Sequence, residues 1–176
     1  MLIFGKNQIF FYYLRGWLSS IWELRSTEGC DAKRGAIGQG AFYKCSSLER
    51  IRFSSTISEV GHCAFWSCKQ LKNVVLNEGL QKIGKVVFFE CASLESIKFS
   101  STISEIGDRS FKCCHELKDV VLNKGLWTIG KGAFYECSFL ESIKLSSTIF
   151  EIGDGAFKYC HELKNVVLNE GLKKIG

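Results

Sequence analysis

Cysteine is the residue type whose spacing most directly suggests chemistry in this chain. There are nine cysteines among 176 residues, and thiols bind metal ions, form disulfides or act as nucleophiles. Six of the nine recur at intervals of 23 residues: Cys45, Cys68, Cys91, Cys114, Cys137 and Cys160. Such a fixed period predicts that these six thiols occupy the same place in a repeated structural unit.

The six in-phase thiols are predicted to be structural. Each stands among the apolar positions of its repeat, and a buried free thiol packs like a small hydrophobic side chain. Stacked repeats would also bring neighbouring cysteines towards the Cα separation of about 5 Å at which a disulfide forms, so that alternative stays open. A ladder of free thiols is typical of a reducing compartment, which favours the cytoplasm.

The sequence lacks the sets of residues that a metal site or a catalytic site needs. The sequences His62-Cys63 and Cys113-Cys114-His115 resemble fragments of a zinc site, but no C-x-x-C pair faces a second pair at the spacing of such a site. Catalysis needs a nucleophile, a base and an orienting group that converge, and only three histidines are present. We therefore predict no catalytic residue, no metal site and no cofactor.

A 23-residue repeat positions all of these side chains. From Ile37 the pattern I-G-x-x-A-F-x-x-C-x-x-L-x-x-I/V-x-L/F-x-x-x-L/I-x-x runs six times to residue 174, and residues 175–176 repeat its first two letters. We number the positions of each repeat from 1 to 23, with Ile37 at position 1. Position 2 is Gly, position 6 is Phe and position 12 is Leu in all six repeats. One unit cannot bury its apolar side alone, so the repeat predicts a solenoid of stacked coils.

The apolar spacing within one repeat predicts the local structure. Positions 15 and 17 alternate with polar residues, which indicates a short strand with one buried face. Position 21 and the next position 1 indicate a second extended piece that ends at a glycine corner. The A-F-x-x-C segment predicts one short helical turn, with Asp108 and Asp154 as N-caps. The expected fold is an α/β repeat solenoid with stacked short parallel strands and short helical turns.

The 23-residue repeats also alternate in type, which gives a second, longer period of 46 residues. Blocks 83–128 and 129–174 are identical at 32 of 46 positions. Two positions consequently alternate in charge, which predicts cross-strand ion pairs that contribute about 0.2–1 kcal/mol each. Position 13 carries Glu49, Lys72, Glu95, Lys118, Glu141 and Lys164, and position 23 carries Glu59, Lys82, Glu105, Thr128, Glu151 and Lys174.

The repeat resembles the BspA-type class of leucine-rich repeat, with residues 37–174 matching the pattern over about four-fifths of the chain. It departs where that family has Pro after the strand, since the chain has Ser or Asn there. These residues can form a turn through side-chain hydrogen bonds. The resemblance implies a right-handed leucine-rich-repeat-like coil and a non-catalytic recognition scaffold, often at a cell surface.

The two ends differ from the array. Residues 1–36 break the period and are interpreted as a degenerate N-terminal repeat or cap, whereas 37–176 hold six repeats and the start of a seventh. The apolar run 9–14 is too short to span a bilayer, and no secretory signal is clear. The C-terminal coil has no polar cap, which predicts either a fragment of a longer array or an edge that pairs with another chain.

Three columns of outward side chains are candidate binding surfaces, because stacked coils align equivalent residues along the solenoid. Position 16 alternates cations with valine: Arg52, Val75, Lys98, Val121, Lys144 and Val167. Position 7 is aromatic in three successive coils, as Tyr43, Trp66 and Phe89, and position 22 is aromatic in two, as Trp127 and Phe150. The position-16 column suits an acidic protein or a surface glycan, and the aromatic columns suggest an interaction patch, with a half-buried place beside the short helix as the alternative for position 7. The alternative for position 16 is a solvated sheet face in which valine serves strand formation.

The predicted function is non-catalytic recognition of a protein or surface glycan. The alternative is a structural or self-assembling solenoid fragment of a longer repeat protein. The net charge of +5 comes from 23 basic and 18 acidic residues that are interspersed, so no basic arm predicts a nucleic-acid partner. The thiols favour the cytoplasm, and the family resemblance favours the cell surface or secretion.

Overall fold

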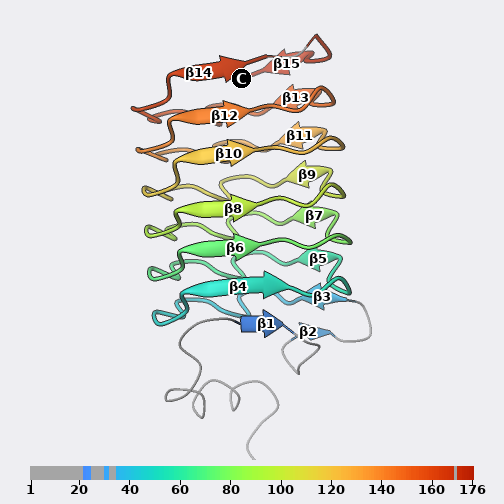
Figure 1. Cartoon of the computed structure of the whole chain (residues 1–176), viewed down its shortest axis with the longest axis vertical. Helices are drawn as coiled ribbons and strands as arrows, with labels where there is room; N and C mark the ends of the chain where they lie inside the picture. Colours follow the sequence, from blue (N-terminus) through green and yellow to red (C-terminus); the bar gives the residue numbers. More distant parts are fainter. Residues whose placement is uncertain (1–21, 25–29, 32–34, 169) are drawn as a thin grey trace, which may run out of the picture.

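The computed structural model describes residues 22–24, 30–31, 35–168 and 170–176. Every secondary-structure element in these segments is a short β-strand. Successive coils stack in one direction, with two sheets on different sides of the stack (Figure 1). The prediction of a repeat solenoid with stacked parallel strands is confirmed.

Sheet A has seven parallel strands formed by positions 14–17. Its order is β1 (Trp22–Leu24), β4 (Arg50–Phe53), β6 (Asn73–Val75), β8 (Ser96–Lys98), β10 (Asp119–Val121), β12 (Ser142–Lys144) and β14 (Asn165–Val167). In β4, Ile51 and Phe53 are buried and Arg50 and Arg52 are exposed, because alternate side chains of a strand point to opposite faces. From β4 onward, paired residues are 23 apart, as in Ile51 opposite Val74.

Sheet B has eight strands, formed mainly by position 23 and the following position 1. Its strands are β2 (Cys30–Asp31), β3 (Ala36–Ile37), β5 (Glu59–Val60), β7 (Lys82–Ile83), β9 (Glu105–Ile106), β11 (Thr128–Ile129), β13 (Glu151–Ile152) and β15 (Lys174–Ile175). All neighbours are parallel except β2 and β3, which are antiparallel.

The A-F-x-x-C segment forms a third ladder of hydrogen bonds, so the prediction of short helical turns is wrong. Alternate amides close tight turns within the coil, as when Tyr43 N donates to Gly40 O at 3.0 Å. The amides between them reach the next coil, as when Phe42 N donates to Ala64 O at 2.7 Å. In a helix all these amides would donate to carbonyls of the same coil, whereas here half of them donate to carbonyls of the next coil. We call positions 3–9 the turn face.

Left-handed backbone makes this alternation possible. Positions 4 and 8 have φ between 51° and 63° in all six repeats: Gly40, Cys63, Val86, Arg109, Gly132 and Gly155 at position 4, and Lys44, Ser67, Glu90, Cys113, Glu136 and Tyr159 at position 8. A residue in this region interrupts the helical path. The proposed N-caps are therefore wrong as well, and Asp108 Oδ1 instead accepts the amide of Lys131 from the next coil at 3.0 Å.

The core is a stack of aromatic rings flanked by aliphatic columns. The position-6 phenyl rings lie nearly parallel, with centroids 4.9–5.5 Å apart from coil to coil. Phe65, Phe88, Phe111 and Phe134 are fully buried, as are most residues at positions 1, 12 and 15. Each coil thus buries the face that its neighbour leaves open, which is the packing that a repeat array requires.

Glycine at position 2 is explained by close approach. We expected conformational freedom at a corner, but the glycines with positive φ lie elsewhere in the described chain. A Cβ on Gly84, Gly107, Gly130 or Gly153 would lie 2.6–2.7 Å from backbone atoms of the preceding coil. Corners of successive coils therefore nest closely enough to leave no room for a side chain.

Serine and asparagine at position 18 form hydrogen bonds in place of proline, but in different ways. Ser54 Oγ accepts the amide of Thr56 at 3.1 Å, within its own turn. Asn77 Nδ2 and Asn123 Nδ2 instead donate to the carbonyls of Phe53 and Phe99 in the preceding coil. The alternation of Ser and Asn is thus part of the contact between coils.

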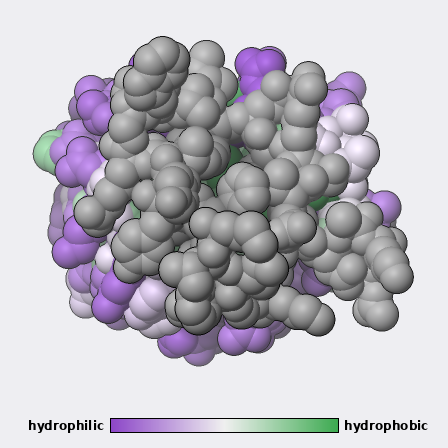
Figure 2. Space-filling view, turned by 90° about the horizontal axis from the view of Figure 1, so that it is seen from below, coloured by the Kyte–Doolittle hydropathy of each residue, from purple (hydrophilic) through white to green (hydrophobic). Residues whose placement is uncertain are grey.

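Most of residues 1–36 lie outside the described residues, including the apolar run 9–14. The stretch Trp22–Leu24 extends sheet A as β1, with Trp22 opposite Ile51. Within the described ranges, no helix has the length and apolarity needed to cross a membrane. Viewed from the β1 end, the described residues around the rim are mainly hydrophilic (Figure 2).

Candidate functional site

The position-16 column lies on the outer face of sheet A. Register pairing places Arg52 beside Val75 and Val75 beside Lys98, and it places Val121 beside Lys144 and Lys144 beside Val167. Five of the six side chains are exposed and Val75 is half-buried. The structure therefore builds the predicted column of alternating cations and valines.

The cations of this column are available to a partner. Neither Lys98 nor Lys144 forms an ion pair with any residue that the structure describes. Four of the neighbouring outward position-14 side chains are short polar groups that bond in pairs: Ser96 Oγ donates to Asn73 Oδ1 at 2.8 Å, and Ser142 Oγ donates to Asp119 Oδ1 at 2.6 Å. The longer side chains at position 16 consequently project beyond these short position-14 side chains, whose polar groups are already hydrogen-bonded.

Between β8 and β10 the pairing is sparser. Ser96 opposite Asp119 is the one register pair between these strands, whereas β10 and β12 pair through three residues. Lys98 and Val121 are not a register pair, so the column consists of two in-register halves, Arg52–Val75–Lys98 and Val121–Lys144–Val167.

The position-7 column is an aromatic strip on the turn face, and it runs further than predicted. Tyr43 meets Trp66 edge-on at 5.7 Å between centroids, and Trp66 meets Phe89 at 4.9 Å. Lys112 Nζ then lies 5.8 Å from the centroid of Phe89 and 4.2 Å from that of Tyr135. A lysine between two aromatic residues at the same repeat position is the sequence signal that our reasoning missed.

The position-22 pair is the most exposed aromatic contact among the predicted surfaces. Trp127 and Phe150 have centroids 6.3 Å apart, and 59% and 44% of their surfaces remain exposed. The structure thus places these two residues together as predicted.

The two predicted charge ladders differ in outcome. No ion pair joins the position-13 side chains in the described part of the chain, so that prediction is wrong. Position 23 does form pairs, with Lys82 Nζ at 3.1 Å from Glu105 Oε2 and Lys174 Nζ at 2.6 Å from Glu151 Oε1. Register does not explain the difference, because position 13 is also held beside its equivalent in the next coil: Lys72 N donates to Glu49 O at 2.8 Å, and Glu141 N donates to Lys118 O at 2.8 Å. The position-13 side chains are exposed and nevertheless do not pair.

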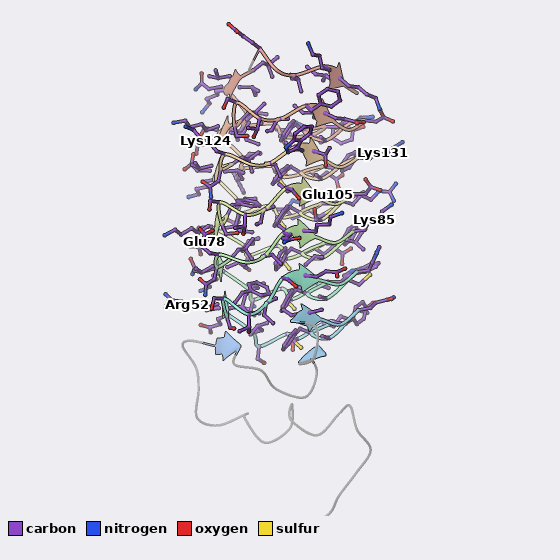
Figure 3. All side chains as sticks on the ribbon, turned by 90° about the vertical axis from the view of Figure 1, so that its right-hand side faces the viewer. Arg52, Glu78, Lys85, Glu105, Lys124 and Lys131 are labelled. Atoms are coloured by element: carbon purple, nitrogen blue, oxygen red, sulfur yellow. The ribbon has the colours of Figure 1, made fainter. Side chains whose placement is uncertain are left out.

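A further charge ladder at position 3 was not predicted. Lys85 pairs with Asp108 at 2.8 Å, and Lys131 pairs with Asp154 at 3.2 Å. Figure 3 places Lys85 and Lys131 on the same side of the stack, away from Arg52. The hydrogen bond from Lys85 lowers the pKa of the Asp108 carboxyl. Alternating charges at positions 23 and 3 therefore line the sheet B side, while position 16 stays open on sheet A.

The six in-phase thiols are free and stack in register, which confirms their structural interpretation. Five of them also act as donors, from Cys68 to Cys160: Cys68 Sγ donates to Phe42 O at 3.1 Å, and Cys114 Sγ donates to Phe88 O at 3.2 Å. Each such carbonyl comes from position 6 of the preceding coil. Burial raises the pKa of Cys91 to about 12, so this thiol stays protonated as a donor and does not act as a nucleophile.

The zinc-like fragments do not converge on a metal site. Among the described residues, no group of three or more His, Cys, Asp or Glu side chains could hold a metal ion. Cys113 Sγ instead donates to Glu136 Oε2 at 3.1 Å, and its pKa is raised to about 12 by burial and then by Glu136. His115 Nδ1 lies 3.3 Å from Ser138 Oγ.

The chain belongs to the family described as BspA type leucine rich repeat region. Residues 35–164 match this family in six copies, in agreement with the six coils and their shared hydrogen-bond pattern. The chain is therefore a leucine-rich repeat scaffold. No curated protein matches it.

Solved structures of other leucine-rich repeat proteins share the fold. The T. pallidum leucine rich repeat protein TpLRR is 35% identical with a TM-score of 0.69, over 73% of this chain and 60% of that protein. A leucine rich cell surface protein from Faecalibacterium prausnitzii is 28% identical with a TM-score of 0.65, over 70% of this chain and 34% of that protein. A leucine-rich repeat protein from Bacteroides ovatus is 28% identical with a TM-score of 0.61, over 78% of this chain and 42% of that protein. The matched region is thus between about a third and three-fifths of each relative.

Proposed function

We propose that this chain is a non-catalytic scaffold that recognises a protein through the outer face of sheet A. The observation that carries the proposal is the position-16 column, in which exposed cations without ion pairs alternate with valines in strand register. The cations attract an acidic partner and the valines offer apolar contact. This combination favours both fast association and specific binding.

The rigidity of the array supports this function. Three ladders of hydrogen bonds and a continuous ring stack hold each coil to the next, so the column keeps its spacing without a partner. A preorganised surface loses little conformational entropy on binding. A surface glycan is the other partner class, and the aromatic strip at position 7 would be its contact.

The compartment we propose is the cell surface. One solved relative is described as a cell surface protein, and the comparisons lend no support to the cytoplasmic expectation. The thiols do not require a reducing compartment, because those of the inner coils are buried between neighbouring coils and hydrogen-bonded.

Affinity capture with matched variants tests the proposal. The double variant Val121→Ala and Lys144→Ala removes one cation and one valine from the position-16 column, and the variant Trp127→Ala and Phe150→Ala removes the position-22 pair. We expect the first variant to lose proteins that the unaltered chain captures from cell-surface extracts, and the second to retain them. An unchanged set for the first variant would remove the sheet A face as the site.

A second candidate function is end-to-end assembly, favoured by the coil that contains β14 and β15. Val166, Leu168 and Ile175 are 42%, 53% and 58% exposed, whereas their equivalents in inner coils are buried. A second copy stacked on this coil would cover them and pair their strands. Sedimentation velocity over a hundredfold concentration range tests this, because a single species at all concentrations would exclude assembly.

A further inference from the structure

The spacing of the position-16 column points to one class of partner. We propose that the outer face of sheet A binds an acidic amphipathic α-helix that lies along the stacking axis, across the strands. This inference rests on the proposed recognition function and specifies the shape and charge of the partner.

The strand register fixes the spacing of the column. Val75 lies opposite both Arg52 and Lys98, so the two cations are separated by two strand spacings. Neighbouring strands are about 4.8 Å apart, and cations on alternate strands are therefore about 9.6 Å apart with a valine midway. Val121, Lys144 and Val167 repeat this spacing in the second half of the column, beyond the sparser pairing of β8 with β10.

An α-helix has a matching period. Residues seven apart lie about 10.5 Å apart on the same face, and residues three or four apart lie about half that distance along the axis. A helix with acidic residues at i and i+7 and an apolar residue at i+3 or i+4 would therefore meet Arg52, Lys98 and the Val75 between them. The difference of about 1 Å per period is small for lysine, whose four-carbon stem is flexible.

An extended strand does not match. It covers about 9.9 Å in three residues, but side chains three apart point to opposite faces. Side chains on one face of a strand repeat at about 6.6 and 13 Å, and neither value meets a cation spacing of about 9.6 Å. The column therefore favours a helix over an extended peptide.

The rest of the face is compatible with a helix. Beyond Arg50, the side chains at positions 14 and 18 on either side of the column are short, as in Ser96, Ser100 and Ser142. The acidic neighbour Asp119 accepts a hydrogen bond from Ser142 and forms no ion pair with a described lysine. Position 16 thus retains unpaired positive charge for carboxylates of the partner.

Two labelled peptides test the inference with the whole chain. The probe is a helical peptide of three heptads with Glu at i, i+7 and i+14 and Leu at i+3 and i+10. The control peptide has the same composition with the glutamates five residues apart, so that they spread around the helix. Fluorescence anisotropy measures both, and we expect the heptad peptide to bind at least about tenfold more tightly.

Charge-matched variants show where the peptide binds. Arg52→Glu with Lys98→Glu reverses the two in-register cations of the column, and Lys72→Glu with Lys118→Glu makes the same charge change at position 13. We expect the first pair to weaken binding by about tenfold or more and the second to change it by less than about twofold. Circular dichroism confirms the fold of both variants, which alter exposed residues only.

The outcomes separate the helix inference from the recognition function. Equal affinity for the two peptides, or an equal loss for the two double variants, would overturn the helical partner. If the position-16 variants also fail to alter the captured proteins, the sheet A proposal fails too. Loss of captured protein without binding of the heptad peptide would refute the helix and leave the recognition face intact.

Discussion

Replacing Gly107 by alanine should lower the unfolding free energy through a steric clash between two coils, and by more than the loss of glycine's backbone freedom would. Gly107 is a buried position-2 residue, and a Cβ there would lie 2.7 Å from the carbonyl carbon and oxygen of Gly84. To open these contacts from 2.7 Å to an ordinary 3.4 Å, the two corners must move apart by about 0.7 Å.

That movement has a calculable cost. Gly107 N donates to Ile83 O at 2.9 Å, and a shift of about 0.7 Å would stretch this hydrogen bond past the range in which it is effective. Loss of the bond leaves buried polar groups unsatisfied, at about 1–3 kcal/mol, and overpacking adds about 1–3 kcal/mol. Partial relaxation shares these costs, so we expect the unfolding free energy to fall by about 2–4 kcal/mol.

Gly132→Ala is the matched control. Gly132 has a φ of 59°, but its Cβ would make only ordinary contacts, at 3.5 Å from Arg109 Cγ and 3.6 Å from Tyr135 Cβ. Its cost should be that of the left-handed backbone alone, about 1 kcal/mol. Urea unfolding followed by circular dichroism and tryptophan fluorescence compares the two. If Gly107→Ala loses no more stability than Gly132→Ala, close approach of the coils is not the reason for glycine at position 2.

Three further predictions concern single side chains. Lys124 and Ser147 occupy the repeat positions of Glu78 and Ser101, two coils further on. Glu78, on the same side of the stack as Lys124 (Figure 3), accepts the amide and hydroxyl of Ser101 at 3.2 and 2.7 Å. Lys124→Glu should accept the same two bonds from Ser147 and so raise the unfolding free energy by up to about 1 kcal/mol in thermal or urea unfolding; a lower stability would contradict this. Asp108→Asn should lower the unfolding free energy by less than about 1 kcal/mol at neutral pH, since the ion pair of Asp108 is solvent-exposed. Because the folded-state pKa of Asp108 is lowered, the difference in stability between the variant and the unaltered chain should vanish as the pH falls through that pKa. A difference that persists in strong acid would refute this linkage. Iodoacetamide at pH 8 should label Cys91 only as fast as the protein unfolds, because burial raises its pKa to about 12; rapid native-state labelling by mass spectrometry would show that the thiol is accessible.

Sequence patterns predicted the surfaces better than the hydrogen bonds beneath them. The aromatic contacts at positions 7 and 22 follow from the period alone, because equivalent residues of stacked coils must be neighbours. Tyr43 and Trp66, or Trp127 and Phe150, are therefore found together. The position-13 ladder fails on the same logic, since register brings charges near but does not make exposed side chains pair.

The 23-residue period by itself determined the number of coils, the residues that face the core and the register of both sheets, because a unit that cannot bury its own apolar side must stack on an identical one. Tertiary structure decided how the A-F-x-x-C segment folds, why position 2 is glycine and what the thiols bond to. In each case the deciding partner lies in an adjacent coil: Ala64 for the amide of Phe42, Gly84 for Gly107 and Phe42 for Cys68. The spacing of residues within one repeat could not reveal these contacts. A segment that could form a helical turn forms a ladder of hydrogen bonds instead only because the next coil supplies the partners.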